Sequence, residues 1–430
     1  MATDLLALSE SILDGTTSIE SRHPVAMFGT TELHELGDGL AFIESFANVT
    51  AFDVDGRLLM IDAGGILAAG KVHAAIRRWT DSPLDTAVYT HGHVDHVFAV
   101  PMFDAEDTSV RPTVVAHENV PRRFDRYQLT NGYNGWINQR QFQLPEPMFP
   151  RDFRYPDRTY ERDLTLDVGG LRVELHHDKG ETDDGTWAWI PERSVLCTGD
   201  LFIWAAPNCG NPQKVQRFPW EWAVALRRMA ALGAELMLPG HGLPIAGRDR
   251  VHHVLTTSAE LLESIHDQTL ELMNSGATLD ELIHTVRVPE HLIELPWLQP
   301  VYDEPEFVVR NLWRLYGGWY DGDPSTLKPS PKAELAVELA TLAGGASVLA
   351  ERAGELSDAG DHRMACHLAE LAGDAAADDP AIHRLRAQVY AARAEHERSV
   401  MSKGVYRWAQ RRSDDVVERA SGTDGRSGTE

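Results

Sequence analysis

Residues 90–96 read Thr-His-Gly-His-Val-Asp-His and follow directly on a short apolar run. The run has the composition of a buried strand, so the polar residues fall on the loop at a strand end. His91 and His93 can reach one metal ion, while Asp95 and His96 can turn to a second. The spacing therefore predicts a hydrolytic site with two metal ions. A surface histidine cluster without a metal is the plainer alternative, and the spacing and strand context disfavour it.

Short apolar runs broken by glycines lie on both sides of this stretch. Such runs are typical of successive strands joined by tight turns. Apolar residues with helical spacing separate them at 70–79 and 219–232. Beyond about residue 251 the pattern becomes almost wholly helical, so the sequence predicts an α/β domain followed by a helical one. The predicted strands cover residues 40–43, 50–54, 57–62, 86–90, 113–116, 171–175, 186–190, 194–197 and 235–239.

Three further candidate ligands occur where loops should follow strands. Glu181 lies in Gly-Glu-Thr, Asp200 in Thr-Gly-Asp, and His241 in Pro-Gly-His-Gly. The neighbouring glycines allow the backbone to turn sharply and bring a side chain close to a metal ion. Two metal ions need more ligands than residues 90–96 supply, so these three residues complete the predicted set.

Together these motifs resemble the metallo-β-lactamase superfamily. The resemblance rests on the motifs at 91–96, 198–200 and 239–242 and on the early Asp62, and it spans about residues 30–250. It implies an αββα sandwich with a metal site at the sheet edge. It also implies the ligand roles: His91 and His93 bind the first metal, Asp95, His96 and His241 bind the second, and Asp200 bridges the two.

Glu181 stands where most members of this superfamily carry a histidine ligand. The alkyl sulfatase branch carries glutamate there, and the helical part of the chain, over about residues 250–400, looks like the alkyl sulfatase dimerisation domain. That resemblance implies a homodimer. The expected cofactors are two divalent ions, with zinc preferred. Because a carboxylate is a harder ligand than imidazole, Glu181 loosens the preference for zinc and leaves iron or manganese as alternatives. In the other reading, Glu181 is a solvated loop residue and His176 or His177 is the ligand.

The resemblance also suggests residues that contact the substrate. In alkyl sulfatases the stretch after the bridging Asp200 supplies a basic contact to sulfate. Here Lys214 and Arg217 are the candidates, with Asn208 and Asn211 as neutral donors. Arginine would suit sulfate better because its fork donates two bonds at once. The alternative is that both basic residues are solvated loop charges.

Two residues outside the ligand set are expected to support it. Asp62 is predicted to orient ligands of the 91–96 stretch through hydrogen bonds, unless it is only a turn-former. His117 follows a strand and either lies behind the ligands or is structural. Among the ligands themselves, Asp95 and Asp200 are also assigned to catalysis.

Composition and charge limit the class of protein. The chain has 430 residues and a net charge of −25, from 65 acidic and 40 basic residues. This balance repels phosphate backbones and anionic lipid, so we expect no nucleic-acid or membrane partner. The charge does not identify a substrate, and the small anionic ester that we expect is what the alkyl sulfatase resemblance implies. No run approaches the roughly 20 apolar residues of a membrane span. The three scattered cysteines and the lack of a signal-like start indicate a cytoplasmic protein.

The predicted domains are a lead-in at 1–23, a catalytic domain at 24–250, a helical dimerisation domain at 251–412 and a disordered tail at 413–430. The predicted function is hydrolysis of an alkyl sulfate ester to alcohol and inorganic sulfate by a metal-bound hydroxide. A shorter ester is expected, because typical long-chain enzymes continue into a sterol-carrier-like domain. The alternative is a thioesterase, lactonase or other carboxylic ester hydrolase on the same site. A non-catalytic dimeric scaffold is a lesser alternative.

Overall fold

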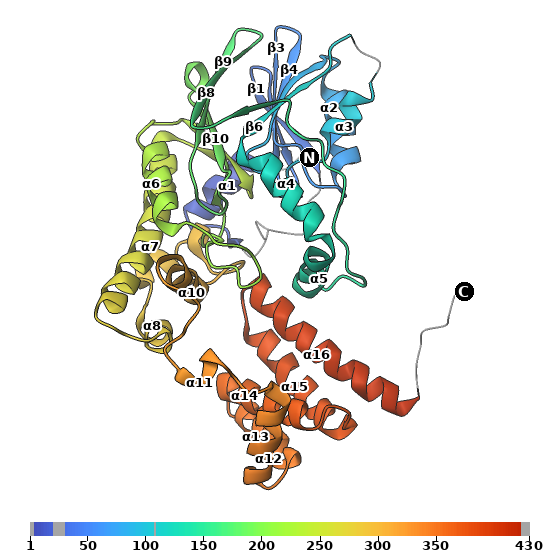
Figure 1. The fold of residues 1–430 in the computed structure, drawn as a ribbon. Helices are drawn as coiled ribbons and strands as arrows, with labels where there is room; N and C mark the ends of the chain where they lie inside the picture. Colours follow the sequence, from blue (N-terminus) through green and yellow to red (C-terminus); the bar gives the residue numbers. More distant parts are fainter. Residues whose placement is uncertain (1–3, 20–30, 107–108, 423–430) are drawn as a thin grey trace. The chain divides into compact units, whose positions relative to one another are not determined.

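The computed structural model describes residues 4–19, 31–106 and 109–422. The chain divides into two compact units. One unit comprises residues 1–131 and 150–319, and the other comprises residues 132–149 and 320–430. In the described part of the chain, the first unit holds two β-sheets with helices packed on them, and the second is helical (Figure 1).

The first sheet contains seven strands in chain order. Strands β1 to β4 pair antiparallel through tight turns, while β4 to β7 pair parallel. The parallel neighbours are joined by crossovers that contain helices, as parallel pairing requires. The strands are β1 (Glu32–Gly37), β2 (Leu40–Glu44), β3 (Val49–Val54), β4 (Arg57–Ile61), β5 (Leu84–Val88), β6 (Thr113–His117) and β7 (Arg158–Tyr160).

The second sheet contains six strands in the order β13-β12-β11-β10-β9-β8. Only the β11–β12 pair is parallel, so the carboxyl ends of these two strands meet at one edge of the sheet. The strands are β8 (Asp163–Val168), β9 (Leu171–His177), β10 (Thr186–Ile190), β11 (Val195–Ile203), β12 (Leu236–His241) and β13 (Ile245–Ala246).

The two sheets share one apolar core, to which Phe42 and Phe52 contribute from the first sheet and Val173 and Leu175 from the second. The opposite face of the first sheet packs against helices α2 (Ala69–Trp79), α3 (Val100–Asp104) and α4 (Asn119–Leu129). Helices α6 (Pro219–Ala230) and α7 (Arg248–Asn274) pack on the second sheet. The layers are therefore helix, sheet, sheet, helix, and the predicted αββα sandwich is confirmed.

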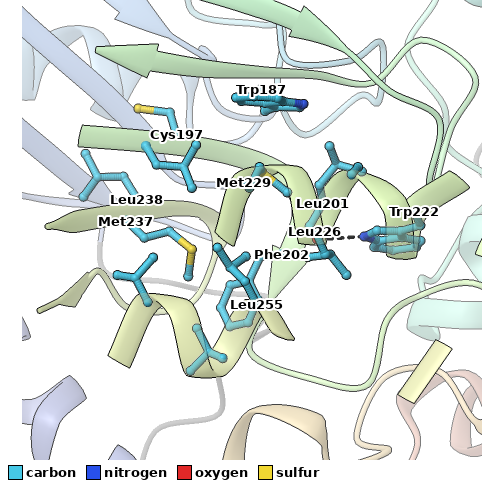
Figure 2. Close-up of a cluster of buried hydrophobic side chains, with 14 of the residues drawn as sticks. Trp187, Cys197, Leu201, Phe202, Trp222, Leu226, Met229, Met237, Leu238 and Leu255 are labelled. Carbon is cyan, nitrogen blue, oxygen red and sulfur yellow. Dashed lines mark hydrogen bonds between the residues drawn. The ribbon is translucent and has the colours of Figure 1, made fainter. Parts of the chain in front are cut away.

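Figure 2 shows why α6 lies on the second sheet. Trp222, Leu226 and Met229 recur at helical spacing and are all fully buried. The Trp222 indole also donates a 2.7 Å hydrogen bond to the carbonyl oxygen of Leu201. Burying each such apolar side chain contributes about 1.5–3 kcal/mol. This packing holds β11 in place, and β11 carries one of the candidate ligands.

Four short or helical segments after α7 also belong to the first unit. Buried residues of these segments join the same core as the sandwich. The compact unit therefore extends to residue 319, beyond the sequence boundary proposed at residue 250. The segments are α8 (Leu279–Thr285), α9 (Glu290–Ile293), a 3-10 turn (Pro296–Leu298) and α10 (Pro305–Tyr316). At the start of the chain, α1 (Leu5–Leu13) packs on this core as well.

The second unit is built from helices with small alanine-rich cores, one of which joins Ala353, Ala365 and Ala369. Helix α5 (Asn131–Phe142) packs closely on the last helix, because a Cβ on Gly404 would lie 2.3 Å from the carbonyl oxygen of Gln141. The helices are α11 (Pro324–Leu327), α12 (Lys332–Ala343), α13 (Ala346–Asp358), α14 (His362–Ala375), α15 (Pro380–His396) and α16 (Val400–Ser421).

The predicted disordered tail at 413–430 is wrong for residues 413–421, which complete helix α16. Ser413 is fully buried and accepts a 2.6 Å hydrogen bond from Arg386. The helix ends at Gly422, whose φ of 71° suits glycine. The polar composition of residues 413–421 gave no indication of the buried contact between Ser413 and Arg386. Residues 423–430 lie outside the described part of the chain.

The described helices were also compared with the length and polarity that a membrane span requires. None of them alone meets both requirements. The bent pair α12 and α13, with 85° between them, meets them jointly by length and composition.

Candidate metal centre

The candidate ligands meet where strands of the two sheets end. Residues 90–96 follow β5, Asp200 lies in β11, and His241 is the last residue of β12. Glu181 lies on the loop between β9 and β10. Gly240 permits the close approach of these elements, because a Cβ there would lie 2.2 Å from Oδ1 of Asp200. The close contact requires glycine at this position.

Two groups of three side chains in the described residues could each hold a metal ion. The first is His91, His93 and Asp200, and the second is Asp95, His96 and His241. Within each group the ligand atoms all lie within 4.8 Å of one another. This arrangement is what two neighbouring divalent cations require.

Asp200 lies between the two groups. Its Oδ2 is 3.5 Å from Nε2 of His91 in the first group and 3.3 Å from Nε2 of His241 in the second. Its Oδ1 is 3.3 Å from Nε2 of His96. The carboxylate can therefore reach both groups at once.

The unsatisfied atoms of the centre fit a pair of metal ions. Nε2 of His91, Nε2 of His96 and Oδ1 of Asp200 are buried without a hydrogen-bond partner among the described residues. A buried polar atom left without a partner costs about 1–3 kcal/mol. Imidazole nitrogen and carboxylate oxygen are both ordinary ligands of divalent cations. A cation between these atoms would supply the missing interaction.

Hydrogen bonds to the other ring nitrogen orient two of the histidines. Nδ1 of His96 lies 2.7 Å from Oδ2 of Asp62, and Nδ1 of His241 contacts the carbonyl oxygen of Phe46. Both partners are acceptors, so Nδ1 carries a proton in each ring and Nε2 is the atom left to face a cation. The two Nε2 atoms lie 3.7 and 3.5 Å from Oδ2 of Asp95, the third member of the second group.

Asp62 also fixes the first group through Thr90. Its carboxylate accepts hydrogen bonds from the Thr90 backbone N–H and hydroxyl, both at 2.8 Å. Since the hydroxyl proton is used there, the Thr90 oxygen accepts from Nδ1 of His91 at 3.0 Å. Nε2 of His91 is then the metal-facing atom. Asp62 thus lies behind both groups, as the sequence predicted for an orienting residue.

The charges of the centre compensate one another. Burial opposes the charge on His96, but the carboxylates of Asp200, Asp62 and Asp95 hold its pKa well above the usual range. In turn, His241, His96 and His91 hold the pKa of Asp200 well below its usual range, although burial opposes this. By contrast, burial lowers the pKa of His93 well below its usual range. The Asp200 carboxylate therefore stays ionised between the two groups.

Glu181 adjoins the first group and is held by two donors. Its Oε1 accepts from Nδ2 of Asn208 and from the Arg217 guanidinium, both at 2.6 Å. It lies 3.8 Å from Nδ1 of His93. Burial raises the pKa of Glu181 to about 7, and Arg217 opposes that rise. Asn208 and Arg217, predicted as substrate contacts, here hold a candidate ligand in place.

The histidines considered as alternatives to Glu181 make other contacts. His176 pairs with Asp163 at 2.6 Å, and Nδ1 of His177 donates to the carbonyl oxygen of Gly185 at 2.8 Å. His177 also stacks on His117, with 3.7 Å between ring centroids. His117 itself faces the carbonyl oxygen of Glu161, so its contacts in the structure are those of a packing residue.

The remaining predicted substrate contacts lie on the loop after β11. Asn211 is buried, and its side chain accepts a 3.0 Å hydrogen bond from the Gln213 N–H within a turn. Lys214 is half-buried. Burial and the nearby Arg217 lower its pKa to about 8, while Asp95 and Glu181 oppose the fall. The Lys214 ammonium is thus attracted by carboxylates beside both metal groups, Glu181 at the first and Asp95 at the second.

Sequence reasoning missed a buried ion pair beside the first group. Asp184 and Arg123 are both buried, and the guanidinium donates to the carboxylate at 2.6 and 2.9 Å. The same carboxylate accepts the N–H of Gly92, between the two histidines of the first group, at 3.2 Å. The two residues are 61 positions apart. No local pattern connects them, although Asp184 lies near Glu181.

Comparison with known proteins identifies the two parts of the chain. The family model described as "Metallo-beta-lactamase superfamily" matches residues 43–241, and "Alkyl sulfatase dimerisation" matches residues 278–415. Residues 43–241 are therefore similar to the metallo-β-lactamase superfamily and residues 278–415 to the alkyl sulfatase dimerisation family, in the order that the resemblance predicted.

Similar curated proteins are named alkylsulfatases. A "Linear primary-alkylsulfatase" of Pseudomonas sp. (strain ATCC 19151) is 29% identical over 358 residues, covering 77% of this chain and 67% of the relative. An "(R)-specific secondary-alkylsulfatase" of Pseudomonas sp. is 25% identical over 360 residues, covering 75% and 53%. The chain thus spans between about half and two thirds of the length of these relatives.

A solved structure has the same fold. It is the stereoselective inverting sec-alkylsulfatase Pisa1 from Pseudomonas sp., with a TM-score of 0.80 and 21% identity. The match covers 89% of this chain and 66% of that chain. At this identity the likeness shows the fold.

Proposed function

We propose that this chain, which joins a metallo-β-lactamase domain to an alkyl sulfatase dimerisation domain, hydrolyses an alkyl sulfate ester to an alcohol and inorganic sulfate. The observation that carries the proposal is the pair of adjoining ligand groups with Asp200 between them. The named activities of the similar proteins favour a sulfate ester over other esters.

The proposed cofactors are two divalent ions, with zinc preferred and iron or manganese as alternatives. His91, His93 and Glu181 would hold the first ion, and Asp95, His96 and His241 the second. Asp200 would bridge them. The preference for zinc rests on the imidazoles, and the alternatives rest on Glu181, because carboxylates suit harder ions.

When bound, two such ions lower the pKa of a shared water and so supply a nucleophile near neutral pH. The chain contributes orientation and charge. Asp62 fixes which nitrogen His96 presents and, through Thr90, which nitrogen His91 presents. Arg217 with Asn208 holds Glu181. Asp95 and Asp200 remain the proposed catalytic residues, because their carboxylates would hold the two ions that supply the nucleophile.

Lys214 is the proposed sulfate contact. It is a cation on the loop beside the centre, and its side chain is only half-buried. Arg217 is fully buried and already paired with Glu181, so we assign it to the ligand and not to the sulfate. An ammonium group attracts the sulfate ester and the sulfate product alike.

Sulfate release from purified, metal-quantified protein tests the proposal. The panel contains primary, secondary and aryl sulfates, thioesters and lactones, with ion chromatography as the readout. We expect release that tracks bound metal and is lost in Asp95→Ala but kept in the exposed control Glu192→Ala. Metal binding with turnover of an acyl substrate only would instead assign the chain to the carboxylic ester hydrolases.

We also propose that the chain forms a homodimer through α12. This helix buries Ala336 and Ala340 within its unit and exposes Leu335, Leu339 and Leu342. Exposed apolar residues at this spacing form one stripe along a helix, which is typical of an association surface. The match to a dimerisation family over these residues supports a second copy as the partner.

The cytoplasm is the proposed location. Its support is the state of the cysteines, since Cys197, Cys209 and Cys366 are all free thiols. Free thiols are typical of a reducing compartment. Cell fractionation of the native protein with antibody detection tests this location, and recovery from an exported fraction would contradict it.

A further inference from the structure

Helix α10 lies against the loop that holds Glu181. This loop, residues 208–217, follows β11 and supplies both donors to the Glu181 carboxylate. A Cβ on Gly210 would lie 2.2 Å from the backbone carbonyl carbon of Phe307, in the first turn of α10. Glycine is therefore required where the loop crosses the start of the helix.

Asn311, further along α10, binds the other end of this loop. Its side chain is buried and pairs with the backbone of Arg217. Oδ1 accepts the Arg217 N–H at 3.2 Å, and Nδ2 donates to the Arg217 carbonyl oxygen at 3.0 Å. The side-chain amide of Gln216 donates to the same Oδ1 at 2.8 Å. Because both polar groups of the asparagine amide are used, they fix the position and the direction of the backbone at residue 217.

The position of this backbone decides where the Arg217 guanidinium lies. Nη1 donates to Oε1 of Glu181 at 2.6 Å and to the carbonyl oxygens of Glu181 and Asn208 at 2.8 and 3.2 Å. Nε is buried and has no hydrogen-bond partner among the described residues. Since Nε makes no contact, the direction of the guanidinium depends on the backbone from which the side chain starts.

Two contacts hold this stretch of backbone, and they lead to different elements. The N–H of Phe218 donates to the carbonyl oxygen of Gly180 at 3.0 Å, on the loop that carries Glu181. Asn311 instead binds residue 217 to α10. Without Asn311, Arg217 would remain attached to the loop that it supports and would lose its attachment to the helix.

We propose that Asn311 is a positioning residue of the metal centre, which fixes the Glu181 carboxylate beside the first group through Arg217. The proposal rests on the proposed function, because Glu181 is taken to be a ligand of the first ion. Oε1 of Glu181 lies 3.8 Å from Nδ1 of His93, so a small movement of Arg217 changes the fit of the first ligand set. Asn311 lies within residues 278–415, the stretch similar to a dimerisation family, so part of that stretch serves the metal centre.

The proposal predicts a selective loss of metal affinity. Asn311→Ala removes both hydrogen bonds to Arg217, and we expect the first ion to bind about 10-fold more weakly, the lower end of the range for supporting partners. The second ion, assigned to Asp95, His96 and His241, should keep its affinity. A residue with a structural role alone would lower both affinities, or the melting temperature without either.

Stepwise titration of the metal-free protein with Zn²⁺, in competition with a chromogenic chelator, measures the two affinities. The absorption spectrum of the Co²⁺-loaded protein is the second readout, because a changed coordination at one ion alters only its part of the spectrum. Neither readout depends on turnover. If the wild type hydrolyses no alkyl sulfate but Asn311→Ala loses one ion selectively, the proposed function fails while the positioning role stands.

Glu181→Ala identifies the step of the titration that belongs to the first ion, and it also tests the route. Because Asn311 acts through Glu181, adding Asn311→Ala to Glu181→Ala should weaken binding by less than a further twofold or so. Losses that multiply in the double variant overturn the proposal, since Asn311 would then act independently of Glu181.

The matched control is Arg314→Ala on the same helix. Arg314 donates to the side chain of Gln216 at 3.0 Å and not to the backbone of Arg217, so both affinities should stay at the wild-type values.

Asn311→Asp is the variant to use if Asn311→Ala does not fold. It keeps the shape of the side chain and the acceptor for the Arg217 N–H but has no amide to donate. We expect it to weaken the first ion about threefold, as for loss of one hydrogen bond. Wild-type affinities in the Asn311 variants overturn the proposal, and so does an equal loss of both ions.

Discussion

At the scale of single residues, the centre depends on partners that hold each candidate ligand from behind. Asp62 serves both groups because its two oxygens reach Thr90 and His96. Glu181 has two donors, and one of them is a guanidinium. Such partners fix which atom faces a cation, and they are what separates a metal centre from a chance cluster of histidines.

Lys214 should make the activity fall on the alkaline side of the pH profile. Its pKa of about 8 means that the ammonium is present below that pH and is lost above it. We expect kcat/KM for an alkyl sulfate to fall as pH rises through about 8. In Lys214→Ala, kcat/KM should fall about 10- to 100-fold at neutral pH, as for loss of a charged hydrogen bond. Initial rates across pH measure both effects.

Lys214→Arg should abolish the alkaline fall in kcat/KM and keep most of the activity, because a guanidinium stays charged throughout this pH range. The exposed Lys179 serves as the control, since Lys179→Ala should leave the profile unchanged. An unchanged alkaline fall in kcat/KM in Lys214→Arg would contradict the assignment of that fall to Lys214.

Asp184 should set the metal affinity of the first group. Asp184→Asn weakens the pair with Arg123 and the acceptor for the Gly92 N–H, so His91 and His93 lose a fixed spacing. Loss of such a supporting contact typically costs 10- to 100-fold in metal affinity. Competition with a chromogenic chelator measures the affinity directly.

Asp183 provides a matched control for this variant. It pairs with the same arginine at 2.5 Å, but its side chain is 44% exposed, and the Gly92 N–H donates to Asp184 instead. Asp183→Asn should therefore leave the metal affinity nearly unchanged. Equal losses in the two variants would mean that the arginine, and not the contact to Gly92, sets the affinity.

At the scale of elements, the ends of parallel strands were the predictable part of the site. The 90–96 loop follows β5, and the motifs at Asp200 and His241 lie on the parallel pair β11 and β12, so motif and strand pattern together placed them near one another. The strand pattern follows from apolar runs with turn residues between them, and it is local in the sequence. The strand pattern alone indicated an α/β domain, and the αββα layers were expected from the resemblance to the metallo-β-lactamase superfamily.

Contacts between distant segments could not be anticipated. The sequence offers Arg217 as a free cation near a sulfate, but the fold buries it against Glu181, 36 residues earlier. Ser413 sits in a polar stretch that resembles a tail, yet one buried contact with Arg386 extends the helix through it. Neither contact leaves a periodic pattern in the sequence, because each depends on how two elements distant in the sequence pack together.

Asp303 links two such elements and should make stability depend on pH. It is fully buried and accepts hydrogen bonds from the N–H groups of Gly210, on the loop after β11, and of Glu304. Burial raises its pKa from 3.8 to about 7. Because the folded value is the higher one, the stabilisation is present below about pH 4 and is lost as pH rises to about 7.

The loss amounts to about 4 kcal/mol in the free energy of unfolding. Urea unfolding at the two ends of this pH range measures it. Asp303→Asn, which cannot ionise, should show a smaller fall in stability over the same range than the wild type. The same fall in both proteins would show that Asp303 does not contribute to it.

At the scale of the whole molecule, the apolar stripe on α12 requires an explanation. Leu335 is 51% exposed and Leu342 is 76% exposed, although the same helix buries Ala336 and Ala340. This surface also explains why α12 and α13 jointly meet the length and polarity requirements of a membrane span. A protein interface and a bilayer select for the same exposed leucines, and the family match favours the interface.

We therefore expect the full chain, of 47.8 kDa, to sediment as a dimer at micromolar concentration. In a two-fold interface each leucine is buried once in each copy, and each burial contributes about 2 kcal/mol to the free energy of dimerisation. Leu335→Ser with Leu342→Ser should then raise the dissociation constant roughly a thousandfold or more and give a monomer. The control Glu334→Ser with Glu338→Ser changes exposed positions of the same helix and should stay dimeric. A wild-type monomer, or a dimer that survives loss of both leucines, would place the association surface elsewhere on the chain.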